Sequence, residues 1–193
     1  MPQQFYARDA LDVARDLLGK RLCRGAVRLR ITEVEAYRWP GDTANHCRAG
    51  RTRRNEPMWG PAGCAYVYLC YGMHWMLNLV TGDTGEGAAV LIRSAEIESG
   101  LAIVRRRRAG LQGPPLCAGP GRLAAALGLD ARFNHHPLHV HGGLEVCEGE
   151  PPAAILEGPR VGIDFASPGD RKAPWRLAEA SSKWVTHRSR FQG

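Results

Sequence analysis

The sequence predicts an α+β fold with a mainly antiparallel sheet. A helical segment precedes the first strand, strand-like alternation dominates the middle of the chain, and no regular strand–helix–strand rhythm follows. This mixture favours α+β over folds that are built from repeated βαβ units. Because 193 residues are enough to bury a sizeable core, and no linker or repeat interrupts them, we expect residues 1–193 to form a single domain.

The first predicted elements are a helix and a hairpin. Asp9 is a suitable N-cap for an apolar helical segment that ends at Gly19. Residues 21–37 then predict a hairpin with a turn near Gly25 and a long second strand over 26–37. Two carboxylates on an otherwise apolar strand face break the local pattern, which often marks a functional position. Period-two alternation places six side chains on this one face: Val27, Leu29, Ile31, Glu33, Glu35 and Tyr37.

The middle of the chain combines a polar loop with apolar strands. The loop is rich in Gly, Pro and Arg and is long enough to line a groove. Two aromatic strands pivot at Gly72, and a later helix ends in a run of arginines that complements its C-terminus. The predicted elements are, in order, a loop at 38–63, strands at 64–71, 73–81 and 87–94, helices from about Glu96 to Arg108 and over 119–129, and short strands at 144–147, 160–165 and 183–186.

The charge of the chain favours a nucleic-acid partner. The net charge is +7 and only three of the 26 basic residues are lysines, namely Lys20, Lys172 and Lys183. Arginine forks bind phosphates bidentately and stack on bases, so this excess suits a polyanion better than a general need for solubility. A genome that prefers arginine codons would produce the same bias, and this alternative stays open.

The cysteines and the N-terminus indicate a cytoplasmic protein. The six cysteines form no C-x-x-C pair, and most lie in apolar runs, as expected of reduced, buried thiols. The N-terminal residues lack the apolar core of a signal peptide, and no apolar stretch is long enough to cross a membrane.

Glu35 and Arg93 are the first candidates for chemistry. A glutamate on a buried strand face is costly unless its charge is used, and Arg93 in a strand of apolar residues is the natural partner. Together they can hold a water that the carboxylate deprotonates as general base. A structural ion pair is the alternative. Glu33 and Glu35 lie roughly 7 Å apart, a spacing within the range of glycoside-hydrolase pairs, although both side chains point the same way.

The aromatic residues suggest a pocket for a flat base. Tyr37, His46 and Tyr68 can sandwich a base, where stacking is worth about 1–3 kcal/mol, or they can simply be core residues. Tyr71 lies beside Gly72 at the strand pivot, where a projecting ring can fill the gap that a flipped nucleotide leaves.

Several other motifs carry little functional information. His135, His136, His139 and His141 lie in a loop-like segment without Cys or carboxylate at ligand spacing, so we expect no metal site there. The arginines at 105–108 suit a solvated helix end. Pro120 removes a donor from the Gly-Pro-Gly segment at 119–121, and no Walker lysine follows.

Taken in order, several motifs resemble the alkyladenine (3-methyladenine) DNA glycosylase family, and the match spans nearly the whole chain. The strand motif Tyr-Val-Tyr-x-x-Tyr-Gly-Met at 66–73, followed by Asn78, is the most specific part. The motifs are ITEVEAY (31–37), DTANH (42–46), RTRRN (51–55), AYVYLCYGMHWMLN (65–78), AAVLIR (88–93), GPGRL (119–123) and RVGI (160–163).

This resemblance implies a role for each matching residue. Glu35 corresponds to the general base that activates water, and Arg93 and the Val161 carbonyl to groups that hold this water. Tyr37, His46 and Tyr68 correspond to the base-stacking pocket, Asn78 to the residue that disfavours the amine of normal guanine, and Tyr71 to the intercalating wedge. Met73, His74 and Arg51 are then expected near DNA.

The resemblance also implies a curved antiparallel sheet with surrounding helices, no metal and no cofactor. The chain departs from the family at His74, where some relatives carry Tyr, and at 175–180, which lacks an aromatic strand. We expect a nucleoid-associated monomer that binds double-stranded DNA containing damaged purines.

The lysine content adds an expectation about the reaction. A glycosylase that also cleaves the strand needs an amine nucleophile, and none of the three lysines lies in the motifs. The sequence therefore predicts a monofunctional base-excision enzyme for alkylated or deaminated purines. Two rivals are a non-catalytic DNA-binding module, against which the intact Glu35 and Arg93 argue, and a carbohydrate hydrolase that uses Glu33 and Glu35.

Overall fold

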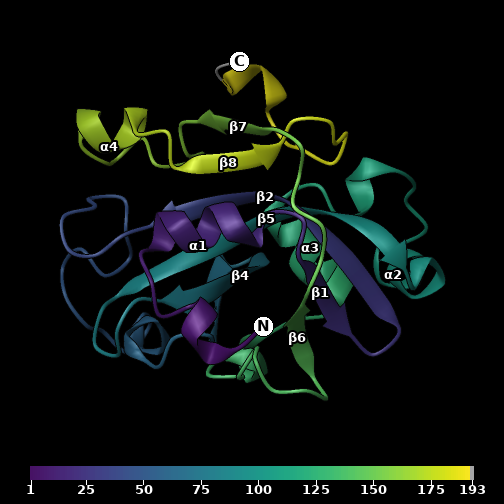
Figure 1. Ribbon diagram of the computed structural model, residues 1–193, viewed down its shortest axis with the longest axis horizontal. Coiled ribbons are helices and arrows are strands. Elements are labelled where there is room, and N and C mark those ends of the chain that lie inside the picture. The colour runs from purple at the N-terminus through teal and green to yellow at the C-terminus, as the bar shows by residue number, and fades with distance from the viewer. Residues whose placement is uncertain (192–193) are drawn as a thin grey trace.

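The computed structural model describes residues 1–191 and has one eight-stranded, curled antiparallel sheet (Figure 1). The strands follow the order β3-β4-β5-β2-β1-β6, while β8 pairs with β2 and β7 with β8. The α+β class with a mainly antiparallel sheet is therefore confirmed. The strands are β1 (Arg21–Arg24), β2 (Val27–Tyr37), β3 (Ala65–Cys70), β4 (His74–Thr81), β5 (Ala88–Ser99), β6 (Leu144–Cys147), β7 (Ile155–Gly158) and β8 (Arg176–Glu179).

The helices are short, and two of their ends carry the local signals that the sequence predicts. The Asp9 carboxylate accepts a 2.8 Å bond from the N–H of Leu11, which confirms this residue as the cap of the first helix. Gly128 adopts the left-handed conformation directly after the third helix, as a C-terminal glycine should. The helices are α1 (Ala10–Leu17), α2 (Leu101–Arg107), α3 (Pro120–Leu127) and α4 (Pro168–Lys172), with 3-10 turns at Gln3–Phe5, Glu56–Trp59, Pro114–Leu116, Ala131–Phe133 and Arg188–Arg190.

The main core forms where α1 and α3 pack against the long central strands. Val13 and Leu17 of α1, Leu123 and Leu127 of α3, and Ile92 of β5 belong to the same buried cluster. Strand β2 connects the two parts of the sheet, because one edge pairs with β5 and the other pairs first with β1 and then with β8. In Figure 1, β7, β8 and α4 lie together at the top of the view, above β2.

The prediction that one face of β2 carries all six alternate side chains is wrong. Val27, Leu29 and Ile31 pack in the main core, but Val34 and Ala36 take over that position further along the strand. The ladder with β5 is irregular between Ile31 and Val34, so the side chains that follow point to the opposite face from the one that strict alternation predicts. This β-bulge moves Glu33, Glu35 and Tyr37 to the face opposite the core.

The alternation of side chains on strand β5 changes face opposite the same point of β2. Ile92 and Ala95 both belong to the core cluster although they are an odd number of residues apart. Glu33 is paired with Ser94 and the next pair is Val34 with Ile92, so Arg93 is the extra residue on β5. The paired irregularities bring Glu35 and Arg93 to the same face of the sheet.

Three predicted elements are corrected. Residues 96–99 continue β5 instead of starting a helix, because they pair with 28–30 of β2, and Gly100 (φ 78°) then separates the strand from α2. Residues 160–165 and 183–186 are not strands. The strand in this region is β8, which has only four residues and no alternation of apolar and polar side chains that the sequence could reveal.

Candidate active site

A cavity of about 580 Å³ brings together most of the predicted site residues. It is lined by side chains from β2 to β5, from the loop that follows β2, and from the segment after β7. Seven of the predicted residues line it: Tyr37, His46, Tyr68, Tyr71, Asn78, Arg93 and Val161. These residues are scattered over 125 positions of the chain, so the fold gathers them.

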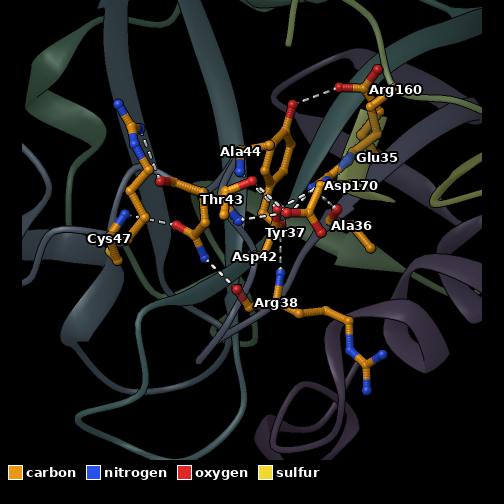
Figure 2. Close-up of polar contacts among 12 residues, drawn as sticks. Glu35, Ala36, Tyr37, Arg38, Asp42, Thr43, Ala44, Cys47, Arg160 and Asp170 are labelled. Carbon is orange, nitrogen blue, oxygen red and sulfur yellow. Dashed lines mark hydrogen bonds and ion pairs between the residues drawn. The ribbon is translucent and has the colours of Figure 1, made fainter. Parts of the chain in front are cut away.

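Glu35 lies directly behind the wall of this cavity. Its side chain is fully buried and does not itself line the cavity, but its partners do. The Tyr37 hydroxyl donates to Oε2 at 2.8 Å (Figure 2), the Val161 N–H donates to Oε1 at 2.8 Å, and Arg93 NH1 lies 3.1 Å from Oε1. Val161 thus offers Glu35 its N–H, whereas the resemblance implied a role for its carbonyl.

Tyr37 is therefore a hydrogen-bond donor as well as an aromatic wall. Burial and the charge of Glu35 raise the pKa of Tyr37, so the hydroxyl keeps its proton at neutral pH. The guanidinium of Arg160 lies over the same ring, 4.7 Å from its centre. The ring is thus held between a carboxylate at its hydroxyl and a cation on its face.

Arg93 is shared between two carboxylates. Its Nε donates to Glu33 at 2.7 Å and its NH1 lies near Glu35, while NH2 donates to the Thr186 hydroxyl at 3.2 Å. Burial alone would lower the pKa of Arg93, but the charges of Glu35 and Glu33 raise it. Burial likewise opposes ionisation of Glu33, yet the charge of Arg93 and bonds from Thr186 hold the pKa of Glu33 below its usual range.

Three rings form an aromatic wall. His46 contacts Tyr68 edge-to-face with ring centres 4.5 Å apart, and Tyr66 stacks on Tyr68 at 5.4 Å. Burial and the nearby Arg54 and Arg48 lower the pKa of His46 to about 4, so the imidazole is neutral at pH 7. Tyr66 was not among the predicted site residues, although its hydroxyl lies 3.2 Å from Nδ1 of His46.

Asn78 is buried in the floor of the cavity. Its Nδ2 donates at 3.2 Å to the carbonyl of Tyr66, which is the cross-strand partner of Asn78 on β3. This bond fixes the orientation of the amide between β3 and β4.

Tyr71 and Met73 project from the turn between β3 and β4. Tyr71 (φ 50°) and Gly72 (φ 71°) both have positive φ. The N–H of Met73 donates to the carbonyl of Cys70 at 3.0 Å, which closes a tight turn. The Tyr71 side chain is 86% exposed and Met73 is 70% exposed. His74 follows at the exposed start of β4.

Arg51 lies apart from the cavity. It is exposed and forms a surface ion pair with Glu56 at 2.7 Å. Contact with DNA at this position stays a prediction.

A second buried ion pair, between Asp42 and Arg160, has no recognisable signal in the sequence. Both side chains are fully enclosed, and two guanidinium–carboxylate contacts of 2.5 and 2.8 Å join them (Figure 2). Arg160 also donates to the carbonyl of Ala36 at 3.0 Å, which anchors Val161 beside Glu35. Thr186 and Arg176, which both contact Glu33, were equally unrecognised because their contacts are distant in sequence.

Three of the four histidines between 135 and 141 have separate partners, and the buried Nδ1 of His139 has none among the described residues. Nε2 of His135 lies 3.0 Å from Glu56, Nε2 of His136 lies 2.9 Å from the carbonyl of Leu144, and Nδ1 of His141 lies 3.0 Å from Glu145. Residues 1–191 contain no group of three or more His, Cys, Asp or Glu side chains arranged to hold a metal ion. In the same residues, no helix combines the length and apolar character needed to cross a membrane.

Comparison with known proteins identifies the family of the chain. The profile of the family described as Methylpurine-DNA glycosylase (MPG) matches residues 4–183. A Nitrosococcus oceani protein named "Putative 3-methyladenine DNA glycosylase" is 62% identical over 192 residues, covering 100% of this chain and 96% of its own. An Arabidopsis thaliana DNA-3-methyladenine glycosylase is 52% identical over 189 residues, covering 96% of this chain and 74% of its own. The chain therefore belongs to the methylpurine-DNA glycosylase family.

Proposed function

We propose that the protein is a monofunctional DNA glycosylase that hydrolyses the N-glycosidic bond of alkylated or deaminated purines flipped out of duplex DNA. One observation carries this proposal. The Glu35 carboxylate is held by Tyr37, Arg93 and Val161, and all three of these residues line a cavity with aromatic walls. A carboxylate that is held in this way behind a cavity large enough for a nucleobase is suited to act as a general base.

Glu35 has one acceptor position left for a water molecule. A carboxylate offers about four lone-pair sites, and the described partners use two on Oε1 and one on Oε2. In the proposed step, Oε2 takes a proton from water, the water oxygen attacks C1′, and the C1′–N bond breaks with its electron pair on the purine. Because Glu35 is fully buried, the Tyr37 ring or the Val161 segment must shift to admit this water.

The walls of the cavity suit a cationic purine. A base alkylated at N3 or N7 carries positive charge, and electron-rich rings stabilise a cation by about 0.5–2 kcal/mol. The pKa of His46, about 4, leaves this ring uncharged at pH 7, so it does not repel such a base. Tyr37 and Tyr68 keep their hydroxyl protons, since burial raises the pKa of both.

Tyr71 is the proposed wedge. Its ring is exposed at the rim of the cavity and can occupy the gap in the duplex once the nucleotide has left. Met73 and His74 continue the same exposed turn, so we assign them contacts with the DNA backbone or neighbouring bases. Arg51 is assigned a phosphate contact on the basis of charge alone.

The absence of a suitable amine supports the monofunctional assignment. Neither Lys20, which pairs with Glu148 at 2.7 Å, nor Lys172 or Lys183 lines the cavity, so residues 1–191 offer no lysine to attack C1′. We further propose a single-domain monomer that acts in the cytoplasm on nucleoid DNA and needs no metal or cofactor.

The test is a panel of duplexes that each carry one 3-methyladenine, 7-methylguanine, hypoxanthine or etheno-adenine. Each duplex is incubated with the protein, with and without a chelator, and half of each sample is then treated with alkali. The proposal expects strand breaks only after alkali and no effect of the chelator. Breaks without alkali would show lyase activity, and intact DNA in every sample would refute the glycosylase assignment.

A further inference from the structure

Glu33 is the most heavily bonded side chain near the site, although the proposed reaction gives it no part. It is fully buried and accepts bonds from Arg93 Nε (2.7 Å), Ser94 Oγ (2.8 Å) and Thr186 N–H (2.7 Å). The Thr186 hydroxyl lies 2.8 Å from it and Arg176 NH1 lies 3.4 Å away. These contacts hold the carboxylate rigidly against Arg93.

Arg93 is consequently fixed on three sides. Its Nε points to Glu33, its NH2 to Thr186 and its NH1 to Glu35. The distance to Glu33 is 2.7 Å, and the distance to Glu35 is 3.1 Å. One guanidinium thus serves two carboxylates, and the closer of the two is not the proposed base.

Glu35 and its surroundings together contain three buried carboxylates and three buried guanidiniums. Arg160 is neutralised by Asp42. Arg93 and Arg176 remain, and Arg176 is the direct cross-strand partner of Glu35 on β8. Without the charge of Glu33, Glu35 would be the only carboxylate near these two cations. The charged and titratable groups around Glu35 are Glu33 and Tyr37 on β2, Asp42 in the following loop, Tyr68 on β3, Arg93 on β5, Arg160 after β7 and Arg176 on β8.

We propose that Glu33 is a positioning residue that holds Arg93 and shares its charge, so that Glu35 stays basic enough to accept a proton from water. This inference rests on the proposed role of Glu35 as general base. A carboxylate that faces two unshared guanidiniums holds its negative charge strongly and takes a proton poorly. Glu33 offsets this effect without touching the substrate.

The first test replaces the charge of Glu33 and keeps its shape. Glu33→Gln should lower the single-turnover rate on a lesion duplex roughly tenfold, because the base is weakened. The acidic limb of the pH–rate profile should move to lower pH by about one pH unit, since Glu35 then resists protonation. Affinity for the lesion duplex should stay within about twofold, because Glu33 does not line the cavity.

A second variant tests the same charge balance in the opposite direction. Arg176→Met removes one cation and keeps most of the buried volume, so the acidic limb should move to higher pH. Structural damage alone would not move the acidic limb to lower pH in Glu33→Gln and to higher pH in Arg176→Met. This variant also keeps the inference testable if Glu33→Gln does not fold, because a limb that fails to rise in Arg176→Met overturns it.

The outcomes separate this inference from the proposed function. If Glu35→Gln still releases bases, the general base is wrong and the role of Glu33 falls with it. If Glu35→Gln is inactive but Glu33→Gln has the parent rate, or loses rate without a downward shift of the limb, only the role of Glu33 is refuted.

Discussion

The hydroxyl of Tyr37 donates a 2.8 Å hydrogen bond to Oε2 of Glu35, two residues earlier on the same strand. Residues two positions apart on a strand point to the same face, so the phenol of Tyr37 and the carboxylate of Glu35 lie next to each other. The ring that lines the cavity is thus also a direct partner of the proposed base. A ligand that displaces this ring would alter the environment of Glu35 at the same time.

Tyr37→Phe should raise the pH at which activity is lost on acidification. The substitution keeps the ring but removes a donor to the charged form of Glu35, so the carboxylate is protonated more easily. Loss of this buried bond should also cost about 1 kcal/mol in the free energy of unfolding. Single-turnover excision across a pH series and urea unfolding measure the two effects. An acidic limb that stays in place would show that the hydroxyl has no influence on the base.

Glu35→Gln should abolish base release and leave affinity for lesion DNA nearly intact. The amide cannot accept the proton of the attacking water, while the aromatic walls that contact the base are unchanged. Excision assays and fluorescence anisotropy with a labelled lesion duplex provide the two readouts. The control is Glu148→Gln, a surface substitution remote from the cavity, which should behave as the parent.

Tyr71→Ala should weaken the flipped complex without affecting the fold. The side chain is 86% exposed, so its removal leaves no cavity in the core. The unstacking that accompanies flipping costs a few kcal/mol, and an inserted ring offsets part of this cost. A fluorescent base analogue opposite the lesion reports flipping directly. Tyr71→Phe serves as control, and an alanine variant that flips as well as the parent would contradict the wedge assignment.

Asp42→Asn should destabilise the protein by about 3–5 kcal/mol, because it leaves the buried charge of Arg160 without its counterion. The urea midpoint measures this loss. The exposed pair of Lys20 and Glu148 provides a matched comparison, and Glu148→Gln should change the midpoint far less. Equal effects of the two substitutions would show that burial of the pair does not determine its contribution.

His46 should make the stability depend on pH. Its native pKa of about 4 lies below the unfolded value of 6.5, so the unfolded chain binds the extra proton between these values. Stability is therefore lost as the pH falls from 6.5 towards 4, by about 1–3 kcal/mol. Urea unfolding near pH 7.5 and near pH 5 measures this loss in the parent. His46→Gln should show a smaller difference, and an equal one would contradict the shifted titration.

Local signals in the sequence predicted the cap of one helix and the end of another. Asp9 caps α1 and Gly128 ends α3, because capping depends on residues only a few positions apart. The motifs also identified side chains that the fold gathers around one cavity. Their catalytic and DNA-binding roles stay predictions.

Distant contacts and strand irregularities were not predictable in this way. The partners of Glu33 include Thr186, 153 positions away, and Asp42 pairs with Arg160 across 118 positions. Neither pairing leaves a pattern in a single sequence. Strict alternation also failed at the β2 bulge, because a bulge is set by its partner strand rather than by local residue type.

The paired irregularities of β2 and β5 tie the length of the segment between Ile31 and Val34 to the placement of Glu35 and Arg93 on one face of the sheet. Deletion of one residue there would reverse every later position of β2, driving Glu35 and Tyr37 inwards and exposing Val34 and Ala36. A compensating deletion at Arg93 would restore the pairing but remove the guanidinium. Insertions and deletions here would therefore disturb both the packing of the core and the contact between Glu35 and Arg93.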